Sequence, residues 1–442
     1  MPALIRLAVS AIMMEAHGPR RRPGPSFSRR KTMIDPVFVT GQQVGLLGGP
    51  LYTTYKVLGA VDLARQKKGQ AVYWLETNDA DFAEINHFTY LDNENQLKTL
   101  RWDKDTGGFS CGLIPVDTKL MEILNLFFDE LTPTKWTESL RELALSCYQP
   151  GETLGTASFR LASALFGGFG IRIFDPSDDG FLREIRPILE KEIATAKPGE
   201  QCNAFLRING KRFALFKTEN GVVFRDKAPA DLGNGQLLPN LKTRSVCQDA
   251  YFHTEAYVAG PGEVAYLADL APWYERHGVK PPRIQRRMSA ILLEPRTKRL
   301  LERTGLTVEE VARENRATLL KKVRTGESGV DFSKLEAQLS ETTKEYLNSI
   351  QRMGLDGKPV GKTLKPALKA ALGRKRAEIN AMVSRKLADA GELSDRLLPG
   401  GVPQERCFNL FYFMNRYGGL NFVQWVLEQH RFESQVLEVG HA

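Results

Sequence analysis

The chain has 442 residues, of which 42% are hydrophobic and 26% charged, with a formal net charge of +9 at pH 7. This length and composition predict about two or three globular domains with at least one large core. They exclude a membrane-spanning protein and predict no membrane partner, because no run approaches the roughly 18 apolar residues that cross a bilayer.

The positive charge is concentrated at the start of the chain. Residues 1–32 hold seven basic side chains and a single acidic one, among many prolines, arginines and serines. Such a composition is typical of a disordered tail, and the rest of the chain is close to neutral. We therefore expect no nucleic-acid partner.

The five cysteines form an odd, scattered set without any Cys-x-x-Cys pair: Cys111, Cys147, Cys202, Cys247 and Cys407. This pattern argues against a disulfide framework and a zinc site, and it favours a reducing cytoplasmic location. Each cysteine is more readily explained as core filler than as a nucleophile.

The first half of the chain alternates strands and helices. Residues 37–40 and 71–76 are short apolar runs that predict buried strands, and the apolar face of 50–67 predicts a helix between them. Strand, turn, helix and strand make a βαβ unit, which implies parallel neighbours. Residues 170–175 predict a third strand. We therefore expect a doubly wound parallel-sheet core over residues 33–295.

The pattern changes at about residue 203. Three β-favouring runs are separated by the turn signals Asn209-Gly210 and Asn220-Gly221, which predict an antiparallel meander. We interpret this as a small β insertion at about 200–230. The core pattern then resumes near Ser245.

Helical signals dominate from residue 296. Thr307 and Glu310 predict a capping box. The apolar positions of 332–353 follow a heptad pattern, and 368–387 carries a second apolar face after a short loop. We therefore expect a helical coiled-coil arm over 296–400. Residues 401–442 are rich in aromatic side chains and are predicted to form a C-terminal helix that packs back on the core.

The first motif that could carry chemistry lies between the first strand and its helix. Glycines there would let backbone amides approach an anion at the helix N-terminus, and a lysine lies two turns into the helix. The absence of a Gly-Lys-Ser/Thr ending excludes a Walker A loop. Tight packing would explain the glycines equally well, but paired glutamines at a strand end are more useful as hydrogen-bonding groups than as core. The candidate binding residues are Thr40, Gly41, Gln42, Gln43, Gly45, Gly48, Gly49, Tyr52 and Lys56.

The second motif follows the second strand, at the edge where an open α/β sheet forms its binding crevice. Four acidic side chains and an imidazole lie there: Glu76, Asp79, Asp81, Glu84 and His87. Such a cluster could hold magnesium, take a substrate ammonium group or supply a general base. The alternative is an acidic helix cap, since aspartates suit a helix N-terminus.

A third, less specific motif is a turn with two glycines around a proline, preceded by a Gln-Asp pair. Its candidate binding residues are Gln248, Asp249, Gly260, Gly262 and Glu263.

The order and the amino-acid sequences of these segments resemble those of the BshC family, described as cysteine ligases of bacillithiol biosynthesis. The resemblance covers residues 36–430. The acidic motif departs from it, with Asn78-Asp79-Ala80-Asp81 where the family commonly reads Glu-Asp-His-Asp. The blocks that carry it are TGQQVGLLGGPLYTTYK, WLETNDADFAEINH, LLPN, CQDAYFHTEAYVAGPGEVAY and QERCFNLFYFMNRYG.

The resemblance implies a Rossmann-like core related to class I aminoacyl-tRNA synthetases, a connecting-peptide-like insertion and a coiled coil that makes a homodimer. It also implies addition of cysteine to glucosaminyl-malate, with the carboxylate activated by ATP and with Mg as a further expected cofactor. Two alternatives come from other classes. One is a nucleotidyltransferase or synthetase-like enzyme with another acceptor, and the other is a non-catalytic coiled-coil binding protein.

Two structural predictions follow from the motifs. The segments Gly41–Gly49 and Glu76–His87 should meet at one strand-end edge, since they follow successive strands of one βαβ unit. There, Gly41–Gly49 and Lys56 would hold an anionic group. Asp79, Asp81, Glu84 and His87 would handle an amine or a magnesium ion.

Overall fold

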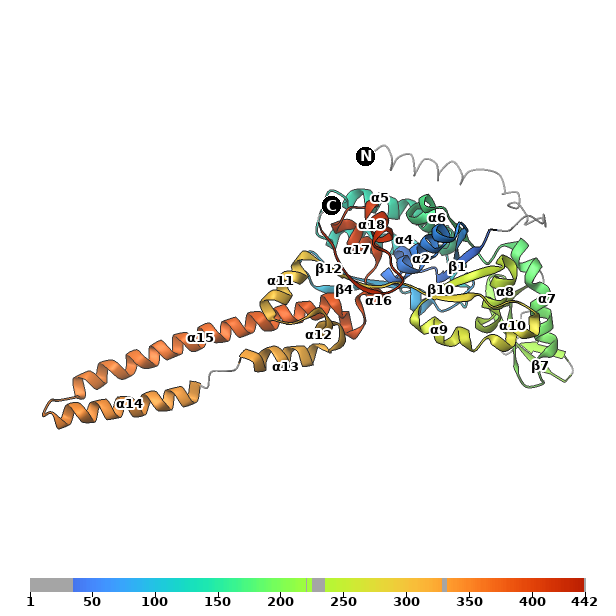
Figure 1. Cartoon of the computed structure of the whole chain (residues 1–442). Helices are drawn as coiled ribbons and strands as arrows, with labels where there is room; N and C mark the ends of the chain where they lie inside the picture. Colours follow the sequence, from blue (N-terminus) through green and yellow to red (C-terminus); the bar gives the residue numbers. More distant parts are fainter. Residues whose placement is uncertain (1–34, 220, 225–234, 328–331, 441–442) are drawn as a thin grey trace. The chain divides into compact units, whose positions relative to one another are not determined.

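The computed structural model describes residues 35–219, 221–224, 235–327 and 332–440 (Figure 1). They divide into two compact units. The core unit comprises the described residues up to Leu292 together with those from Glu405 onward, and the helical unit comprises Leu293–Gln404. The sequence placed these two boundaries after residues 295 and 400. The predicted tail of residues 1–32 lies outside the described residues.

The core unit is built on a five-stranded sheet in which all neighbours are parallel. The order is β5-β2-β1-β10-β11, so the chain adds strands on one side of β1 and then crosses to the other. This is a doubly wound topology, and its direction reverses between β1 and β10. The three predicted strands are confirmed. The strands are β1 (Val37–Gln43), β2 (Gln70–Glu76), β5 (Ile171–Phe174), β10 (Thr254–Ala259) and β11 (Arg283–Arg286).

Helices cover both faces of this sheet because its strands are apolar on both faces. Phe38 and Tyr73 point to a cluster that contains α2 (Leu51–Lys67) and α6 (Leu154–Phe166). Val39 and Trp74, one residue further along each strand, belong to a second cluster. That cluster is formed with α7 (Asp179–Thr195) and α8 (Leu241–Phe252). On the first face lie also α4 (Thr118–Glu130) and α5 (Thr137–Cys147).

The β insertion is a four-stranded antiparallel sheet of order β8-β7-β6-β9. The predicted Asn209-Gly210 turn is confirmed, since both residues have the positive φ that a tight hairpin requires. Asn220 of the second turn lies outside the described residues. The sequence did not predict β9 or the hairpin of β3 (His87–Leu91) and β4 (Leu97–Arg101). The insertion strands are β6 (Gln201–Ile208), β7 (Lys211–Thr218), β8 (Gly221–Phe224) and β9 (Gln236–Pro239).

The last segment is not the single helix predicted for residues 401–442. It forms three short helices, α16 (Gln404–Cys407), α17 (Leu410–Arg416) and α18 (Asn421–Gln429), and a strand, β13 (Ser434–Glu438). The helix is interrupted because Asn409 caps α17 and because Gly418 and Gly419 take positive φ after it. Strand β13 pairs with β12 (Ser289–Leu293). The aromatic side chains of this segment are buried in the core of the unit.

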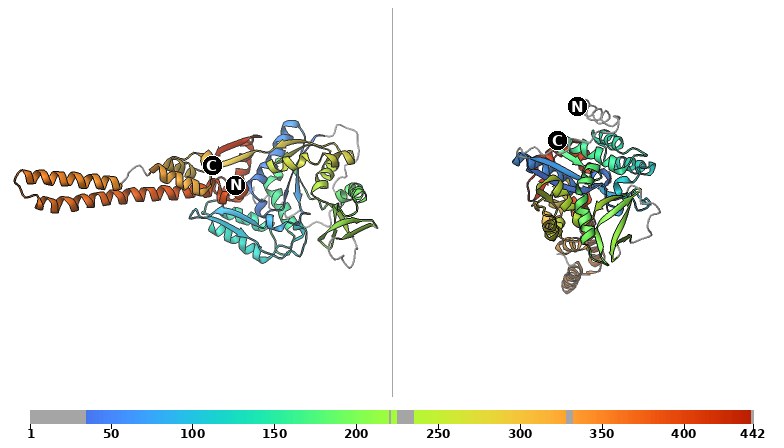
Figure 2. Two further views of the ribbon diagram at one scale, coloured as in Figure 1. Left: turned by 90° about the horizontal axis from the view of Figure 1, so that it is seen from below. Right: turned by 90° about the vertical axis from the view of Figure 1, so that its right-hand side faces the viewer.

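The helical unit is formed by α11 (Pro295–Thr304), α12 (Val308–Arg313), α13 (Arg316–Glu327), α14 (Phe332–Arg352) and α15 (Lys358–Leu397). Figure 1 and Figure 2 both show α14 antiparallel alongside α15, as the heptad pattern predicts. The capping box of Thr307 and Glu310 is confirmed. No helix in the described parts of the chain is long and apolar enough to cross a membrane.

The apolar stripe of α14 is only partly covered within the helical unit. Leu339 and Ile350 are half-buried, whereas Leu335, Tyr346 and Met353 are exposed by 39%, 52% and 76%. Apolar surface of this kind on a long helix usually marks an interaction face.

Candidate functional site

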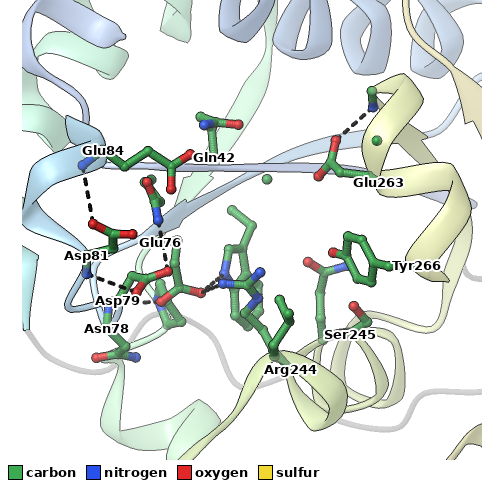
Figure 3. A pocket seen from close by; sticks show the side chains of 18 of the residues that line it. Gln42, Glu76, Asn78, Asp79, Asp81, Glu84, Arg244, Ser245, Glu263 and Tyr266 are labelled. Carbon is green, nitrogen blue, oxygen red and sulfur yellow. Dashed lines mark hydrogen bonds and ion pairs between the residues drawn. The ribbon is translucent and has the colours of Figure 1, made fainter. Parts of the chain in front are cut away.

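A pocket of about 570 Å³ lies in the core unit at the carboxyl ends of β1, β2 and β10 (Figure 3). It is therefore at the point where the strand order reverses, the usual ligand position of a doubly wound sheet. The first two motifs meet there, since Gln43 Nε2 donates to Asp79 Oδ2 over 2.9 Å. The prediction that they share one strand-end edge is confirmed.

The pocket is lined by polar groups of both charges. Its carboxylates are Glu76, Asp79, Asp81, Glu84 and Glu263. Its guanidinium groups are Arg212, Arg244, Arg287 and Arg406. Its amides are Gln42, Gln43, Asn78, Asn240 and Gln248. Such a pocket suits a ligand that carries both anionic and cationic groups.

The acidic loop after β2 presents three carboxylates at one edge of the pocket (Figure 3). Burial works against ionisation of Asp79, but hydrogen bonds from Gln43 and from the amides of Asp81 and Ala80 hold its pKa below the ordinary value. Asp81 accepts from Glu84 N and caps the short helix α3 (Phe82–Ile85). Asp81 and Glu84 are exposed, so the predicted helix cap is confirmed and the same loop also lines the pocket.

Glu76 is the innermost carboxylate of the pocket. It accepts hydrogen bonds from Trp74 Nε1 and from Asn78 N, both over 2.9 Å. Arg244 lies 3.3 Å from it and comes from α8, more than 160 residues further along the chain. Glu76 and Arg244 thus form a salt bridge across the pocket floor, with its cationic end reaching toward the ligand space (Figure 3).

The β insertion braces the acidic loop from the other side. Arg207 is buried, and its Nη1 donates to Asn78 Oδ1 over 2.5 Å and to Ser177 Oγ over 3.1 Å. Arg212 donates to Asn78 O over 2.9 Å and lies 3.5 Å from Asp79 Oδ1. Two arginines of one hairpin therefore fix the backbone that carries Asp79.

Lys56 does not reach the pocket, contrary to the sequence prediction that it holds an anion. Its side chain is buried, and its ammonium donates to Gly41 O and lies 2.7 Å from Glu263 Oε2. Burial lowers the pKa of Lys56, while the neighbouring Glu263 opposes that shift. The ammonium is thus paired inside the fold, and Glu263 is the member of the pair that lines the pocket.

The glycine-rich turn also packs inside the fold, apart from Gly41. A Cβ on Gly45 would lie 2.9 Å from Gly49 Cα, and Gly48 and Gly49 have positive φ. The amide of Leu47 donates to Tyr148 Oη over 2.9 Å. Gly45, Gly48 and Gly49 lie outside the pocket lining, and the close approach at Gly45 and the positive φ of Gly48 and Gly49 account for these glycines without a bound anion.

Three other predicted residues lie outside the pocket lining. Thr40 Oγ1 donates to Val258 O and ties β1 to β10. His87 begins β3, where its Nδ1 lies 3.2 Å from Asn86 Oδ1, and burial and Arg101 lower its pKa. Asp249 accepts from Tyr274 Oη over 2.5 Å, and burial raises its pKa to about 6. Tertiary packing turns each of these side chains away.

The sequence missed the arginines and most of the aromatic side chains of the pocket, including Tyr257 and Tyr266. Single arginines on a strand or a helix follow no recognisable spacing, so no local pattern singled them out. The resemblance gave indirect signals, because Arg406 stands in the QER block and both Tyr257 and Tyr266 stand in the CQDAYFHTEAYVAGPGEVAY block.

Helices α8 and α9 (Pro261–Ala268), which both begin at the pocket, each have a side chain that caps their N-terminus. Asn240 Oδ1 accepts from the amides of Lys242 and Thr243 at the start of α8. Glu263 Oε2 accepts from Gly260 N at the start of α9. Anion binding would therefore fall mainly to the arginines. Among the residues that the structure describes, no group of three or more His, Cys, Asp or Glu side chains is arranged to hold a metal ion.

The doubly wound sheet and the charged pocket at its switch point define an α/β protein of the Rossmann-like class, with the pocket as its candidate small-molecule site. The chain belongs to the BshC family of bacillithiol biosynthesis. The family model of the N-terminal Rossmann-like domain matches residues 29–209 and 198–288, and that of the C-terminal coiled-coil domain matches residues 290–438. The resemblance inferred from the motifs is confirmed.

Three similar proteins carry the name "Putative cysteine ligase BshC". The one from Salinibacter ruber is 27% identical and aligns over 88% of this chain and 80% of its own length. The one from Chlorobaculum tepidum is 28% identical over 86% and 78% of the two chains. The one from Heliobacterium modesticaldum is 28% identical over 88% and 80%.

Proposed function

We propose that this protein is a ligase that joins cysteine to glucosaminyl-malate through an amide bond, as the last step of bacillithiol biosynthesis. The names of its relatives support a cysteine ligase. The observation that carries the proposal is the pairing of a carboxylate edge with several arginines in one pocket. Cysteine and glucosaminyl-malate each carry an amine and at least one carboxylate, so both require groups of both signs.

The reaction needs an activated carboxyl group, for which we propose ATP. A carboxylate oxygen of cysteine would attack a nucleotide phosphorus, which breaks a phosphoanhydride bond and releases pyrophosphate or ADP. The acceptor amine would then attack the carbonyl carbon and lose a proton, and the same oxygen would leave with the phosphoryl group. Arg212 and Arg244 would stabilise the negative charge on the phosphate oxygens. Mg²⁺ is usually held by substrate phosphates and one or two carboxylates, so Glu84 would suffice as its protein ligand and Asp81 would remain available to the acceptor amine.

The carboxylates of the acidic loop would have different roles toward the substrate amines. Asp79 is held ionised by its hydrogen bonds, so it suits an ammonium anchor better than a proton acceptor. Asp81 and Glu84 are exposed at the edge of the pocket, where a bound amine can reach them. A positioned carboxylate that takes the proton of the attacking amine is worth roughly 10²–10⁴ in rate.

We also propose that the arm makes a homodimer. The exposed apolar positions of α14, among them Tyr346 and Met353, would be buried by a second copy of the arm.

The proposed function is tested by mass spectrometry of the enzyme incubated with cysteine, glucosaminyl-malate and magnesium-ATP. The expected product has the mass of the two substrates less one water, and nucleotide is consumed in equal amount. Asp81→Asn should lose most of this product, whereas Asp129→Asn, an exposed carboxylate outside the pocket, should retain it. Pyrophosphate exchange with an amino acid other than cysteine, without this product, would favour the synthetase-like alternative.

A further inference from the structure

The C-terminal segment contributes one exposed cation to the pocket. Arg406 on α16 lines the pocket, and its guanidinium carbon lies 5.6 Å from the centroid of the Tyr52 ring. Among the described residues it has no carboxylate partner. An arginine over a tyrosine face, with its N–H groups free toward a pocket, is ready to bind an anion.

The preceding residue fixes the position of Arg406. Glu405 is buried and accepts two hydrogen bonds from Arg287, over 2.9 Å and 2.7 Å. Its Oε2 also accepts from Ala290 N over 3.1 Å. This bidentate pair holds the short helix α16 against β12 and the loop before it. The backbone of Arg406 is therefore anchored, while its side chain reaches the pocket.

Arg287 also keeps an unused donor at the pocket. It is only 5% exposed, it lies 5.4 Å from the Tyr52 ring centroid, and its Nε has no hydrogen-bond partner. A Cβ on Gly260, which also lines the pocket, would lie 3.5 Å from this Nε. A buried N–H without an acceptor costs free energy, which a ligand oxygen would recover.

The Tyr52 ring is close to both guanidinium groups, and its hydroxyl has a proton to donate. Its hydroxyl accepts from Gln42 Nε2 over 3.0 Å, and no acceptor among the described residues receives its own proton. Two of the nearby cations are neutralised within the fold, because Lys56 pairs with Glu263 and Arg287 pairs with Glu405. Arg406 is left with its positive charge uncompensated.

We infer that Arg406, the Nε–H of Arg287 and the hydroxyl of Tyr52 form a carboxylate subsite that holds the malyl group of the acceptor. This inference rests on the proposed function. In glucosaminyl-malate the amine and the malyl group are attached to adjacent ring carbons, so the groups that bind them must be neighbours. Glu84 and Arg406 are both close to Tyr52, whose pKa is raised by burial and by Glu84 and lowered by Arg406.

The test compares Arg406→Ala and Arg406→Lys with Arg183→Ala, which removes an exposed arginine of α7 outside the pocket. Arg406→Ala should raise KM for glucosaminyl-malate by about 10- to 100-fold, the value of a lost charge-assisted hydrogen bond. It should leave KM for cysteine and ATP unchanged. The KM of Arg406→Lys should lie between those of the wild type and Arg406→Ala, because lysine keeps the positive charge but cannot bind a carboxylate in a bidentate geometry. Arg183→Ala should match the wild type.

A second acceptor isolates the malyl group. With methyl glucosaminide, which has the amine but no carboxylate, the KM of the wild type should be at least as high as that of Arg406→Ala with glucosaminyl-malate, and Arg406→Ala should raise it no further. A rise in KM for cysteine instead would overturn the inference, because Arg406 would then serve the donor.

Calorimetric titration with L-malate, without nucleotide or cysteine, separates the two proposals. Binding by the wild type that Arg406→Ala weakens at least tenfold supports the subsite, even if no amide product is ever found and the proposed function fails. Equal malate binding by both proteins, or none by the wild type, overturns the subsite. An unchanged thermal unfolding temperature of Arg406→Ala would show that this exposed side chain does not contribute to the stability of the fold.

Discussion

Replacing Lys56 by methionine should destabilise the core unit rather than selectively weaken an anionic substrate. The ammonium of Lys56 is almost inaccessible, with 2% of the side chain exposed. It donates to Gly41 O and pairs with Glu263 over 2.7 Å. Methionine keeps most of the volume, so the loss comes from the charge and not from a cavity.

The expected loss is about 3 kcal/mol of unfolding free energy. Removing one partner of a buried ion pair typically costs about 3–5 kcal/mol, because the other charge is left without compensation. The lower end applies here, since 26% of the Glu263 side chain is exposed and water can reach its carboxylate. Glu263 also retains the hydrogen bonds from Gly260 N and Tyr257 Oη.

The measurement is urea unfolding followed by tryptophan fluorescence. All tryptophans lie in the core unit, so the signal reports on that unit alone: Trp74, Trp102, Trp136, Trp273 and Trp425. A double-mutant cycle of Lys56→Met with Glu263→Gln should give a coupling energy of about 2 kcal/mol. Lys67→Met, an exposed lysine on the same helix, should change stability by less than about 0.5 kcal/mol.

Additive effects of Lys56→Met and Glu263→Gln, within about 0.5 kcal/mol, would refute this reasoning. They would mean that the two charges do not meet in the folded protein. Lys56 would then be free to hold an anion, as the sequence alone predicted, and its replacement should raise the KM of one substrate.

The acidic loop, the buried Asp249 and the exposed arm each give a further prediction. Asp81→Asn should lower kcat by roughly 10²–10⁴-fold in the ligation assay, while His87→Ala should leave kcat within about twofold. Equal losses of kcat in the two variants would contradict the assignment of His87 outside the pocket. Burial raises the pKa of Asp249 to about 6, so its stabilising contribution is full below about pH 4 and is lost as the pH rises through 6. Asp249→Asn should remove this pH dependence of the unfolding free energy, which is on the order of 3 kcal/mol between pH 4 and 7. Denaturant unfolding at each pH measures it, and an unchanged pH dependence would mean that another group titrates. Tyr346→Glu combined with Met353→Glu should convert a dimer to a monomer in light scattering at micromolar concentration, with unchanged helical circular dichroism; a monomeric wild type would refute the proposed seam.

Three strands of the parallel sheet, β1, β2 and β5, could be predicted from local patterns because each is a short apolar or β-favouring run. Val37–Val39 and Ala71–Leu75 bury both faces, so no alternation is needed to recognise them. The polar groups that follow these strands could be placed at one edge for the same reason, since parallel strands end together. Gln43 and Asp79 meet as that reasoning predicts.

The helical arm was also predictable, because a long amphipathic helix repeats its signal many times. The last segment was not predictable, since its aromatic residues fall at positions all around a helix and therefore show no helical periodicity. Only the positive φ of Gly418 and Gly419, and the cap at Asn409, divide it into separate helices. These breaks are set by how the segment fits the core.

Which polar side chains face the pocket was decided by tertiary packing. Lys56 and Glu84 look equally suited to a site in the sequence, yet one is paired inside the fold and the other is exposed at the pocket edge. Arg212, Arg244 and Arg406 reach the same space from an insertion strand, a core helix and the C-terminal segment. Local sequence fixes periodicity and strand ends, but a side chain's partner depends on which distant segment packs beside it, and no pattern within one element carries that information.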